Sequence, residues 1–244
     1  MSNTARSTAD AVEMYHKNGF TVLQVFDDSE VRLLEKFARG WIYRLLAQWV
    51  AGKENQYPLE TYHIWSKSLS VDHGSVFRAP NRHTIPPQDV ADALLNDRLK
   101  GFFSMVSVKH YRIWDEGLGW LAFRFIRPGM SDGYPLSRKA WGVATNVISC
   151  WVPIIGYGPD ETLALVPGSH LKEYDKYLPA DSKFRKDEYH LSKKYQNLEL
   201  FRPKLARGEI IVFHPKTLHS EDVLDSSVTR LNLEFRIEPF PAET

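Results

Sequence analysis

The chain has 244 residues, 43% of them hydrophobic and 13% aromatic, and this length allows a single domain with a sizeable core. Its 31 Lys and Arg residues nearly balance 30 Asp and Glu residues, so charge gives no reason to expect nucleic acid or an anionic membrane as the main partner. Cys150 is the only cysteine, which excludes an internal disulfide and a multi-cysteine zinc site. No stretch reaches the ~18–20 uninterrupted apolar residues that span a bilayer. We expect a soluble, cytoplasmic protein whose partner is a small molecule; the sequence carries no signal for an oligomeric state.

The first third of the chain predicts helices arranged around one strand. A helix over 9–16 follows a capping residue, Ser7 or Thr8, and is stopped by Asn18-Gly19. The mostly apolar run 20–26 predicts a strand, and an amphipathic helix is expected from Asp27 through Trp49. A loop-rich segment over 54–87 and a short helical pair over 89–106 complete this part.

From Trp120 onward the sequence consists of short β-like runs separated by Gly, Pro and Asp. This spacing of strands and turns is typical of a β-sandwich or barrel and not of alternating βαβ units. The segment 171–198 is long, charged and rich in tyrosine, which predicts a lid or a binding loop. The predicted strands cover residues 121–126, 143–153, 163–166, 210–213 and 231–237.

His219 and Arg230 are the strongest candidates for chemistry. His219 lies near the end of one predicted strand and Arg230, eleven residues later, begins the next, so both side chains are able to face one interior. A neutral imidazole binds a divalent metal, and a guanidinium binds a carboxylate through two parallel hydrogen bonds. A single histidine or arginine in such a position is more often structural, so the pair is what points to a site.

Four stretches, in order along the chain, resemble the phytanoyl-CoA-dioxygenase-like family of Fe(II)/2-oxoglutarate oxygenases. The C-terminal run 208–235 reads GEIIVFHPKTLHSEDVLDSSVTRLNLEF, and residues 163–170 read LALVPGSH, with a Pro-Gly-Ser-His turn. The strand before this turn contains WVPI at 151–154. Residues 15–37 read YHKNGFTVLQVFDDSEVRLLEKF, like the helix, strand and helix that begin the family fold. In its general sequence character the chain most resembles bacterial members of the family that are found with surface-polysaccharide genes.

This resemblance implies a fold, an activity and two cofactors. The fold is a mainly-β double-stranded β-helix, a cupin-like jelly roll, with N-terminal helices packed on it. One domain, 1–244, would consist of a helical part over 1–118 and a jelly-roll core over 119–244. The activity is that of a 2-oxoglutarate-dependent dioxygenase, an oxidoreductase that uses Fe(II) and 2-oxoglutarate. By the same resemblance His219 is the distal iron ligand, and Arg230 pairs with the 2-oxoglutarate carboxylate.

The other half of the family's metal site is missing from the sequence. The family takes its first histidine and its carboxylate from a His-x-Asp or His-x-Glu pair that follows an Arg-Pro-Gly strand end. Arg127-Pro128-Gly129 is present, but the residues that follow it, MSDGYPLSRKAWG, contain no histidine. In one alignment Met130-Ser131-Asp132 fills the motif, with Asp132 as the carboxylate ligand. In the other, which the upstream spacing favours, Ser137-Arg138-Lys139 fills it and places an ammonium where the carboxylate belongs.

Four polar residues near this gap are candidates for a substrate site. Arg138 and Lys139 lie where the family's metal chemistry takes place, and Asn146 and Ser149 belong to the next predicted strand. Basic groups at this position favour an anionic substrate, such as a nucleotide sugar or a sugar phosphate. Exposed loop charges are the plain alternative.

Three functions follow from these alternatives. The first is a non-haem oxygenase that oxidises a small metabolite, such as a sugar nucleotide or surface-polysaccharide precursor, with His219 and Asp132 on the metal and Arg230 on 2-oxoglutarate. The second is a family member that has lost iron chemistry. It binds an anionic ligand or performs acid–base catalysis through Lys139 and His219, because a lysine in a desolvated pocket is able to act as a base or Schiff-base nucleophile. The third is a structural or regulatory binding module, since a fold does not determine a function.

Overall fold

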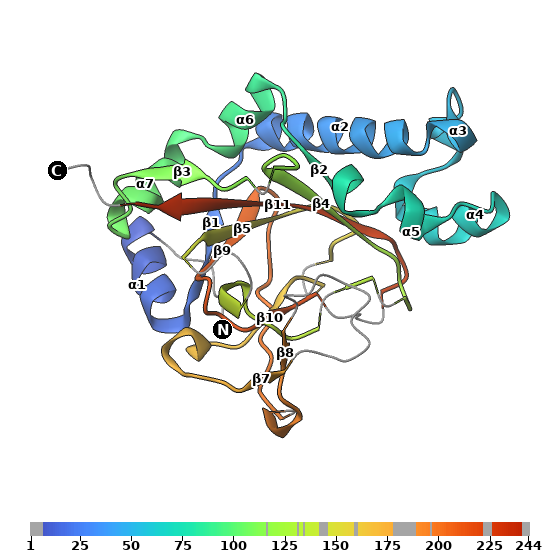
Figure 1. Ribbon diagram of the computed structural model, residues 1–244. Helices are drawn as coiled ribbons and strands as arrows, with labels where there is room; N and C mark the ends of the chain where they lie inside the picture. The colour runs from blue at the N-terminus through green and yellow to red at the C-terminus, as the bar shows by residue number, and fades with distance from the viewer. Residues whose placement is uncertain are drawn as a thin grey trace.

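A computed structural model describes residues 7–115, 117–130, 132–133, 135–141, 146–158, 161–177, 189–195, 197–221 and 226–240. Within these ranges the chain forms a large antiparallel sheet, a smaller sheet that faces it, and helices from the N-terminal half (Figure 1). A mainly-β fold with N-terminal helices packed on it is what the sequence predicts.

The main sheet has seven strands within the described residues, all in antiparallel pairs. Six of them run in the order β1-β9-β5-β11-β4-β2, and β3 pairs with the C-terminal end of β11. The long strand β11 therefore lies at the centre of the sheet, between β5 and β4. The strands are β1 (Phe20–Gln24), β2 (His83–Thr84), β3 (Tyr111–Ile113), β4 (Leu121–Ile126), β5 (Ile148–Ile155), β9 (Glu209–Phe213) and β11 (Arg230–Pro239).

The smaller sheet pairs β6 (Ala164–Leu165) with β10 (His219–Ser220). Two single-residue bridges extend it, Ser137 with His219 on one side and Leu165 with Phe201 on the other. A separate pair, β7 (Lys176–Tyr177) with β8 (His190–Leu191), lies in the segment predicted as a lid or binding loop. Residues 178–188 and 196 of that segment, like residues 143–145 of the predicted strand before β5, lie outside the described residues.

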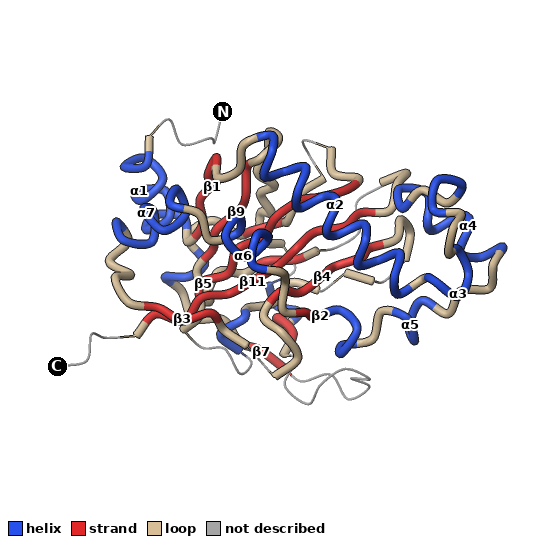
Figure 2. Tube along the Cα trace, turned by 90° about the horizontal axis from the view of Figure 1, so that it is seen from above, coloured by secondary structure: helices blue, strands red, loops and turns tan. Residues whose placement is uncertain are grey.

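The helices cover the outer face of the main sheet and extend past it. Figure 2 shows α2 (Asp28–Leu45) and α6 (Gln88–Leu94) across the sheet, with α3, α4 and α5 beyond one end. No helix in the described part of the chain is long and apolar enough to cross a membrane. The other helices are α1 (Thr8–Asn18), α3 (Ala47–Val50), α4 (Tyr62–Ser68), α5 (His73–Val76) and α7 (Asp97–Met105), and 3₁₀ turns lie at 54–56, 59–61, 79–82, 139–141, 169–171 and 193–195.

Two helical predictions differ from the structure. The second helix ends at Leu45 and not at Trp49, and the segment 54–87, predicted as loop, contains α4 and α5. Helices this short are not stable alone, and they form here because packing holds them. The ring of Tyr62 contacts those of Phe77 and Phe125, at centroid distances of 5.8 Å and 4.8 Å. Tertiary contacts of this kind leave no periodic pattern in the sequence.

Residues of β11 alternate between an apolar and a polar environment, because successive side chains of a strand point to opposite faces. The apolar set joins the core beneath the helices, where Cys150 is also buried, as predicted. The polar set faces the smaller sheet, and a second apolar cluster containing Trp151, Leu165 and Phe213 lies between the two sheets. We call the region between the two sheets the barrel interior. The apolar set is Leu231, Leu233, Phe235 and Ile237, and the polar set is Arg230, Asn232, Glu234 and Arg236.

Gly208 and Gly40 predict opposite effects of the same substitution. Gly208, in the turn before β9, has a φ of +83°, and a Cβ there would lie 2.2 Å from the carbonyl oxygen of Phe26. Gly208→Ala is therefore expected to destabilise the fold by at least about 1–2 kcal/mol. Gly40 lies in α2 with no atom within 4 Å of an added Cβ, so Gly40→Ala is expected to stabilise by about 0.5–1 kcal/mol. Urea unfolding measures both changes, and effects of the same sign would contradict this account.

Candidate functional site

His219 lies at the start of β10, directly opposite Ser137. The backbone N–H of each residue donates to the carbonyl oxygen of the other at 3.0 Å, so their side chains project from the same face. His219 is 5% exposed, and its Nδ1 lies 2.9 Å from the carbonyl oxygen of Thr217. Because a carbonyl only accepts, Nδ1 carries the proton and Nε2 keeps its lone pair. Burial, and then the charge of Lys139, lowers the pKa of His219 to about 3, so the ring is neutral at neutral pH.

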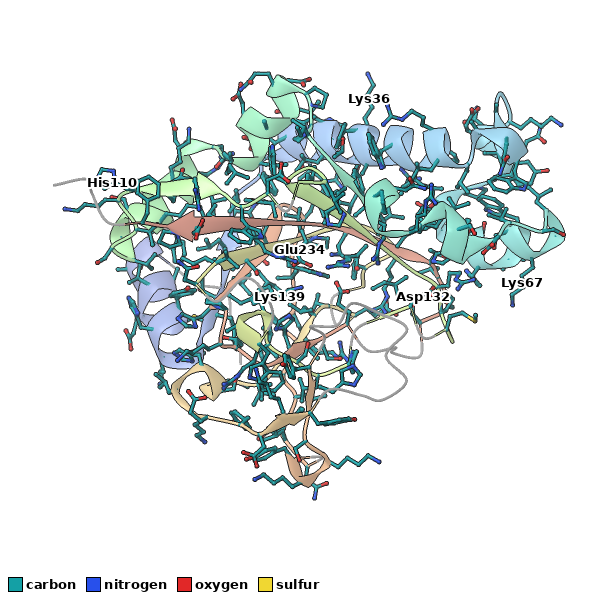
Figure 3. The ribbon with its side chains drawn as sticks, in the orientation of Figure 1. Lys36, Lys67, His110, Asp132, Lys139 and Glu234 are labelled. Atoms are coloured by element: carbon teal, nitrogen blue, oxygen red, sulfur yellow. The ribbon has the colours of Figure 1, made fainter. Side chains whose placement is uncertain are left out.

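Lys139 brings an ammonium group to the same region. It lies two residues after Ser137, at the start of the 3₁₀ turn 139–141, and its Nζ is 3.0 Å from Oε1 of Glu234 on β11. Figure 3 shows Lys139 and Glu234 close together inside the fold. The pairing of Ser137 with His219 agrees with the second alignment, in which Ser137-Arg138-Lys139 stands where the family has His-x-Asp.

Glu234 is a carboxylate buried among three cationic side chains. Its oxygens lie 3.3 Å from Nε of Arg124, 3.1 Å from Nη2 of Arg236 and 3.0 Å from Nζ of Lys139. Burial alone raises the pKa of the Glu234 carboxyl, but the three neighbouring charges outweigh burial and hold this pKa well below its usual range. The carboxyl is therefore ionised. We call Glu234, Lys139, Arg124 and Arg236 the Glu234 cluster.

Arg230 lies toward the other end of β11, roughly 13 Å from Glu234 along the strand. Its side chain is 4% exposed, and its Nη1 donates to the carbonyl oxygen of Glu161 at 3.2 Å. The guanidinium carbon is 5.6 Å from the ring centre of Tyr157. No carboxylate of the described residues lies within 4 Å of the guanidinium. A group with five N–H donors thus has one hydrogen-bond partner in the described chain.

Three buried polar atoms that line the barrel interior have no hydrogen-bond partner in the described structure: Oγ of Ser149, Nδ2 of Asn232 and Oε2 of Glu221. Asn232 accepts a hydrogen bond from Tyr157 at 2.7 Å through Oδ1, and Glu221 accepts one from Trp151 at 3.2 Å through Oε1. An unpaired buried polar group costs about 1–3 kcal/mol, so a water or a polar ligand is expected at these atoms.

Asp132, the carboxylate of the first alignment, is engaged elsewhere. Its Oδ2 accepts from the backbone N–H of Arg127 at 3.0 Å and from Nε at 2.7 Å, and its Oδ1 accepts from Nη2 at 2.8 Å. Oδ2 also lies 3.7 Å from Nε2 of His73. Figure 3 shows Asp132 toward the end of the fold that carries α4 and α5, away from Lys139. The structure does not bring Asp132 to His219.

The four predicted substrate-site residues separate into two groups. Arg138 donates to the carbonyl oxygens of Ser169 and Lys172, so it braces the Pro-Gly-Ser-His turn. Asn146 is exposed. Lys139 and Ser149 both belong to the barrel interior, since Ser149 is fully buried and pairs in register with Arg236 of β11.

The sequence predicts Glu234 on an ion-pairing face of the last strand, with Asn232 and Arg236, and the structure pairs Glu234 with Arg236; Arg124 and Tyr157 were missed as site residues. The available signal is the alternation along β11, where polar residues at 230, 232, 234 and 236 are separated by apolar ones. That alternation predicts an ion-pairing face, but it does not identify the partners. Arg124 lies 110 residues from Glu234 in the chain, and only the sheet brings them together.

The iron site that the sequence resemblance implies requires two histidines and a carboxylate on one face. Beside His219 stand a hydroxyl, on Ser137, and an ammonium, on Lys139, which has no lone pair for a metal. Among the described residues, no group of three or more His, Cys, Asp or Glu side chains is placed to hold a metal ion. These residues therefore do not fit the family's Fe(II) centre.

Removal of the Glu234 charge is expected to destabilise the fold strongly. Glu234→Gln keeps the shape of the side chain but leaves Lys139, Arg124 and Arg236 without this buried carboxylate, and such a loss costs about 3–5 kcal/mol. Glu238→Gln, on the same strand, is the control. Its partner Arg112 has a side chain 69% exposed, so this loss is expected to cost less than about 1 kcal/mol. Chemical denaturation measures the free energy of unfolding of both variants. Equal decreases would show that the Glu234 cluster contributes no more to stability than an exposed ion pair does.

Solved structures of similar fold span nearly the whole chain. The non-heme alpha ketoglutarate dependent carbocyclase SnoK from nogalamycin biosynthesis superposes with a TM-score of 0.60 at 13% identity, covering 98% of this chain and 87% of that one. The epimerase SnoN, solved with Fe3+, alpha ketoglutarate and nogalamycin RO, gives 0.59 at 16% identity, covering 95% and 83%. EvdO2 from Micromonospora carbonacea var. aurantiaca gives 0.58 at 16% identity, covering 100% and 96%. At these identities the likeness establishes the fold, the predicted double-stranded β-helix.

A comparison with curated protein sequences gives no significant match. Residues 15–221 match the phytanoyl-CoA dioxygenase (PhyH) family, a range that runs from α1 through His219. The family prediction made from the sequence motifs is thereby confirmed. The chain belongs to the phytanoyl-CoA dioxygenase family, a family of 2-oxoglutarate-dependent non-haem oxygenases.

Proposed function

We propose that the barrel interior binds a small anionic metabolite, that Arg230 holds its carboxylate or phosphate, and that the chain acts on this metabolite as an enzyme. The observation that carries the proposal is the buried guanidinium of Arg230, whose hydrogen bonding in the described chain is limited to one backbone carbonyl. A buried charge without a counter-charge costs several kcal/mol, so a ligand is the expected source of the opposite charge. The unpaired Nδ2 of Asn232, two residues along the same strand, offers a further donor.

2-Oxoglutarate is the first anion to consider. The chain belongs to a family of 2-oxoglutarate-dependent enzymes, and its structural neighbour SnoN was solved with alpha ketoglutarate. A guanidinium binds a carboxylate through two parallel, charge-assisted hydrogen bonds, which suits the carboxylate at either end of this molecule. For the substrate proper we propose a sugar nucleotide or another surface-polysaccharide precursor, the class to which the sequence resemblance points.

Two reaction classes are compatible with such a ligand, and one observation favours each. Family membership favours 2-oxoglutarate-dependent oxidation, and His219 holds the tautomer that leaves Nε2 able to bind a metal. The ammonium of Lys139 beside His219 favours a reaction without iron. In that reaction Lys139 donates a proton or a hydrogen bond to the substrate, and His219, whose pKa is lowered to about 3, accepts a hydrogen bond. We place the iron-free reaction first, because the residues beside His219 do not fit an iron centre.

The anchor at Arg230 is testable by ligand-induced stabilisation. A ligand at 100 times its Kd stabilises the native state by about 2.7 kcal/mol, which corresponds to a rise of several degrees in Tm for a chain of this length. The expected result is a rise with 2-oxoglutarate or a sugar nucleotide in the wild type and no rise in Arg230→Gln. Arg112→Gln, at an exposed position, is the control and should keep the shift. No shift with either ligand in the wild type, or an equal shift in Arg230→Gln, contradicts the proposal.

The two reaction classes separate in one spectroscopic measurement. When Fe(II) and 2-oxoglutarate bind together in the family's manner, they give a weak visible charge-transfer band under anaerobic conditions. For the iron-free reaction we expect no such band, even at concentrations at which 2-oxoglutarate raises Tm. A band that disappears in His219→Ala would instead establish iron-dependent oxidation.

A further inference from the structure

We infer that Lys139 replaces a metal ion and that its ammonium supplies the positive charge which the ion would bring to the barrel interior. Ser137 and Lys139 occupy the two positions that would complete a three-ligand metal face with His219. This inference deepens the iron-free form of the proposed function. It does not depend on the anion at Arg230.

The first support is the strand register at Ser137. The reciprocal backbone hydrogen bonds between Ser137 and His219, both 3.0 Å, make them a directly opposed antiparallel pair. The side chains of such a pair lie side by side on one face, with Cβ atoms about 4.5–5.5 Å apart. A histidine at position 137 would therefore share a face with the imidazole of His219, whose Nε2 already has its lone pair available.

The second support is the direction of Lys139. Its side chain is 19% exposed and its Nζ contacts the buried Oε1 of Glu234. The side chain at position 139 therefore points into the barrel interior, as the side chain at position 137 does. An aspartate at position 139 would start from the same backbone and enter the same interior from the side opposite β11.

The third support is the charge that Lys139 balances. Glu234 is 4% exposed and requires cations close by, and in this chain Lys139 supplies one together with Arg124 and Arg236. A divalent ion at Nε2 of His219 would be repelled by the ammonium of Lys139. The same ammonium thus fulfils the local need for positive charge and keeps a metal away.

The test is to install the two missing ligands and to measure metal binding directly. Ser137→His/Lys139→Asp should bind one Co(II) per chain, with a Kd on the order of 100-fold lower than any binding by the wild type, because two further ligands complete the face. Equilibrium dialysis gives the stoichiometry, and visible d–d absorption of Co(II) reports nitrogen and oxygen ligation. His219→Ala in the double-variant background should abolish the gain. Lys36→Asp, on the exposed face of α2 (Figure 3), changes charge in the same sense away from the barrel interior and should gain nothing.

Each outcome decides the inference. It is overturned if the wild type binds Co(II) at one per chain in a His219-dependent way, or if the folded double variant binds none. If circular dichroism shows that the double variant is unfolded without metal, it is refolded with Co(II), whose charge takes the place of the Lys139 ammonium beside Glu234, and a His219-dependent gain of structure is expected; no gain there also overturns it. All titrations are made without 2-oxoglutarate or any other carboxylate ligand. Failure of the anion site at Arg230 therefore cannot be mistaken for failure of this inference.

Discussion

The carboxylate of Glu234 is buried between the two sheets, and its charge requires cations from three separate segments to lie within about one hydrogen-bond length of it. Arg124 comes from β4, Arg236 from β11 itself, and Lys139 from the turn that leads out of the Ser137 bridge. Desolvation of four charges is costly and is offset only when all of them are in place. The cluster therefore joins β4, β11 and the 135–141 segment through one buried carboxylate.

Much of the fold was predictable because its strands are short apolar runs between turn residues. The predicted strand at 121–126 is β4, and the predictions at 210–213 and 231–237 lie within β9 and β11. The order of strands in the sheet was less accessible, since β1 pairs with β9 and β4 with β11 across more than a hundred residues. Short helices such as α4 were inaccessible for a different reason: burial of Tyr62 and its aromatic neighbours maintains them, and local propensity does not.

For the candidate site, resemblance to known motifs pointed to His219 and Arg230, and both lie buried next to the barrel interior. The choice between the two alignments needed the register of Ser137 against His219, which no spacing rule supplies. Arg138 and Lys139 are adjacent and equally basic in the sequence, yet one braces the Pro-Gly-Ser-His turn and the other contacts Glu234. Arg138 directly precedes the 3₁₀ turn 139–141 and Lys139 begins it, so the basic dipeptide alone does not reveal which of its charges faces the barrel interior.

The pairing of Ser137 with His219 uses main-chain atoms only. The sheet at this point therefore does not depend on which side chain position 137 carries. Position 139 has to supply a positive charge to the carboxylate of Glu234. Folding and chemistry are therefore separable at position 137, whereas at position 139 they are linked through Glu234, and any change from one kind of centre to another has to supply a new positive charge beside that carboxylate. Membership of a family therefore identifies the fold more securely than the reaction. In this fold the reaction depends on the identity of two side chains.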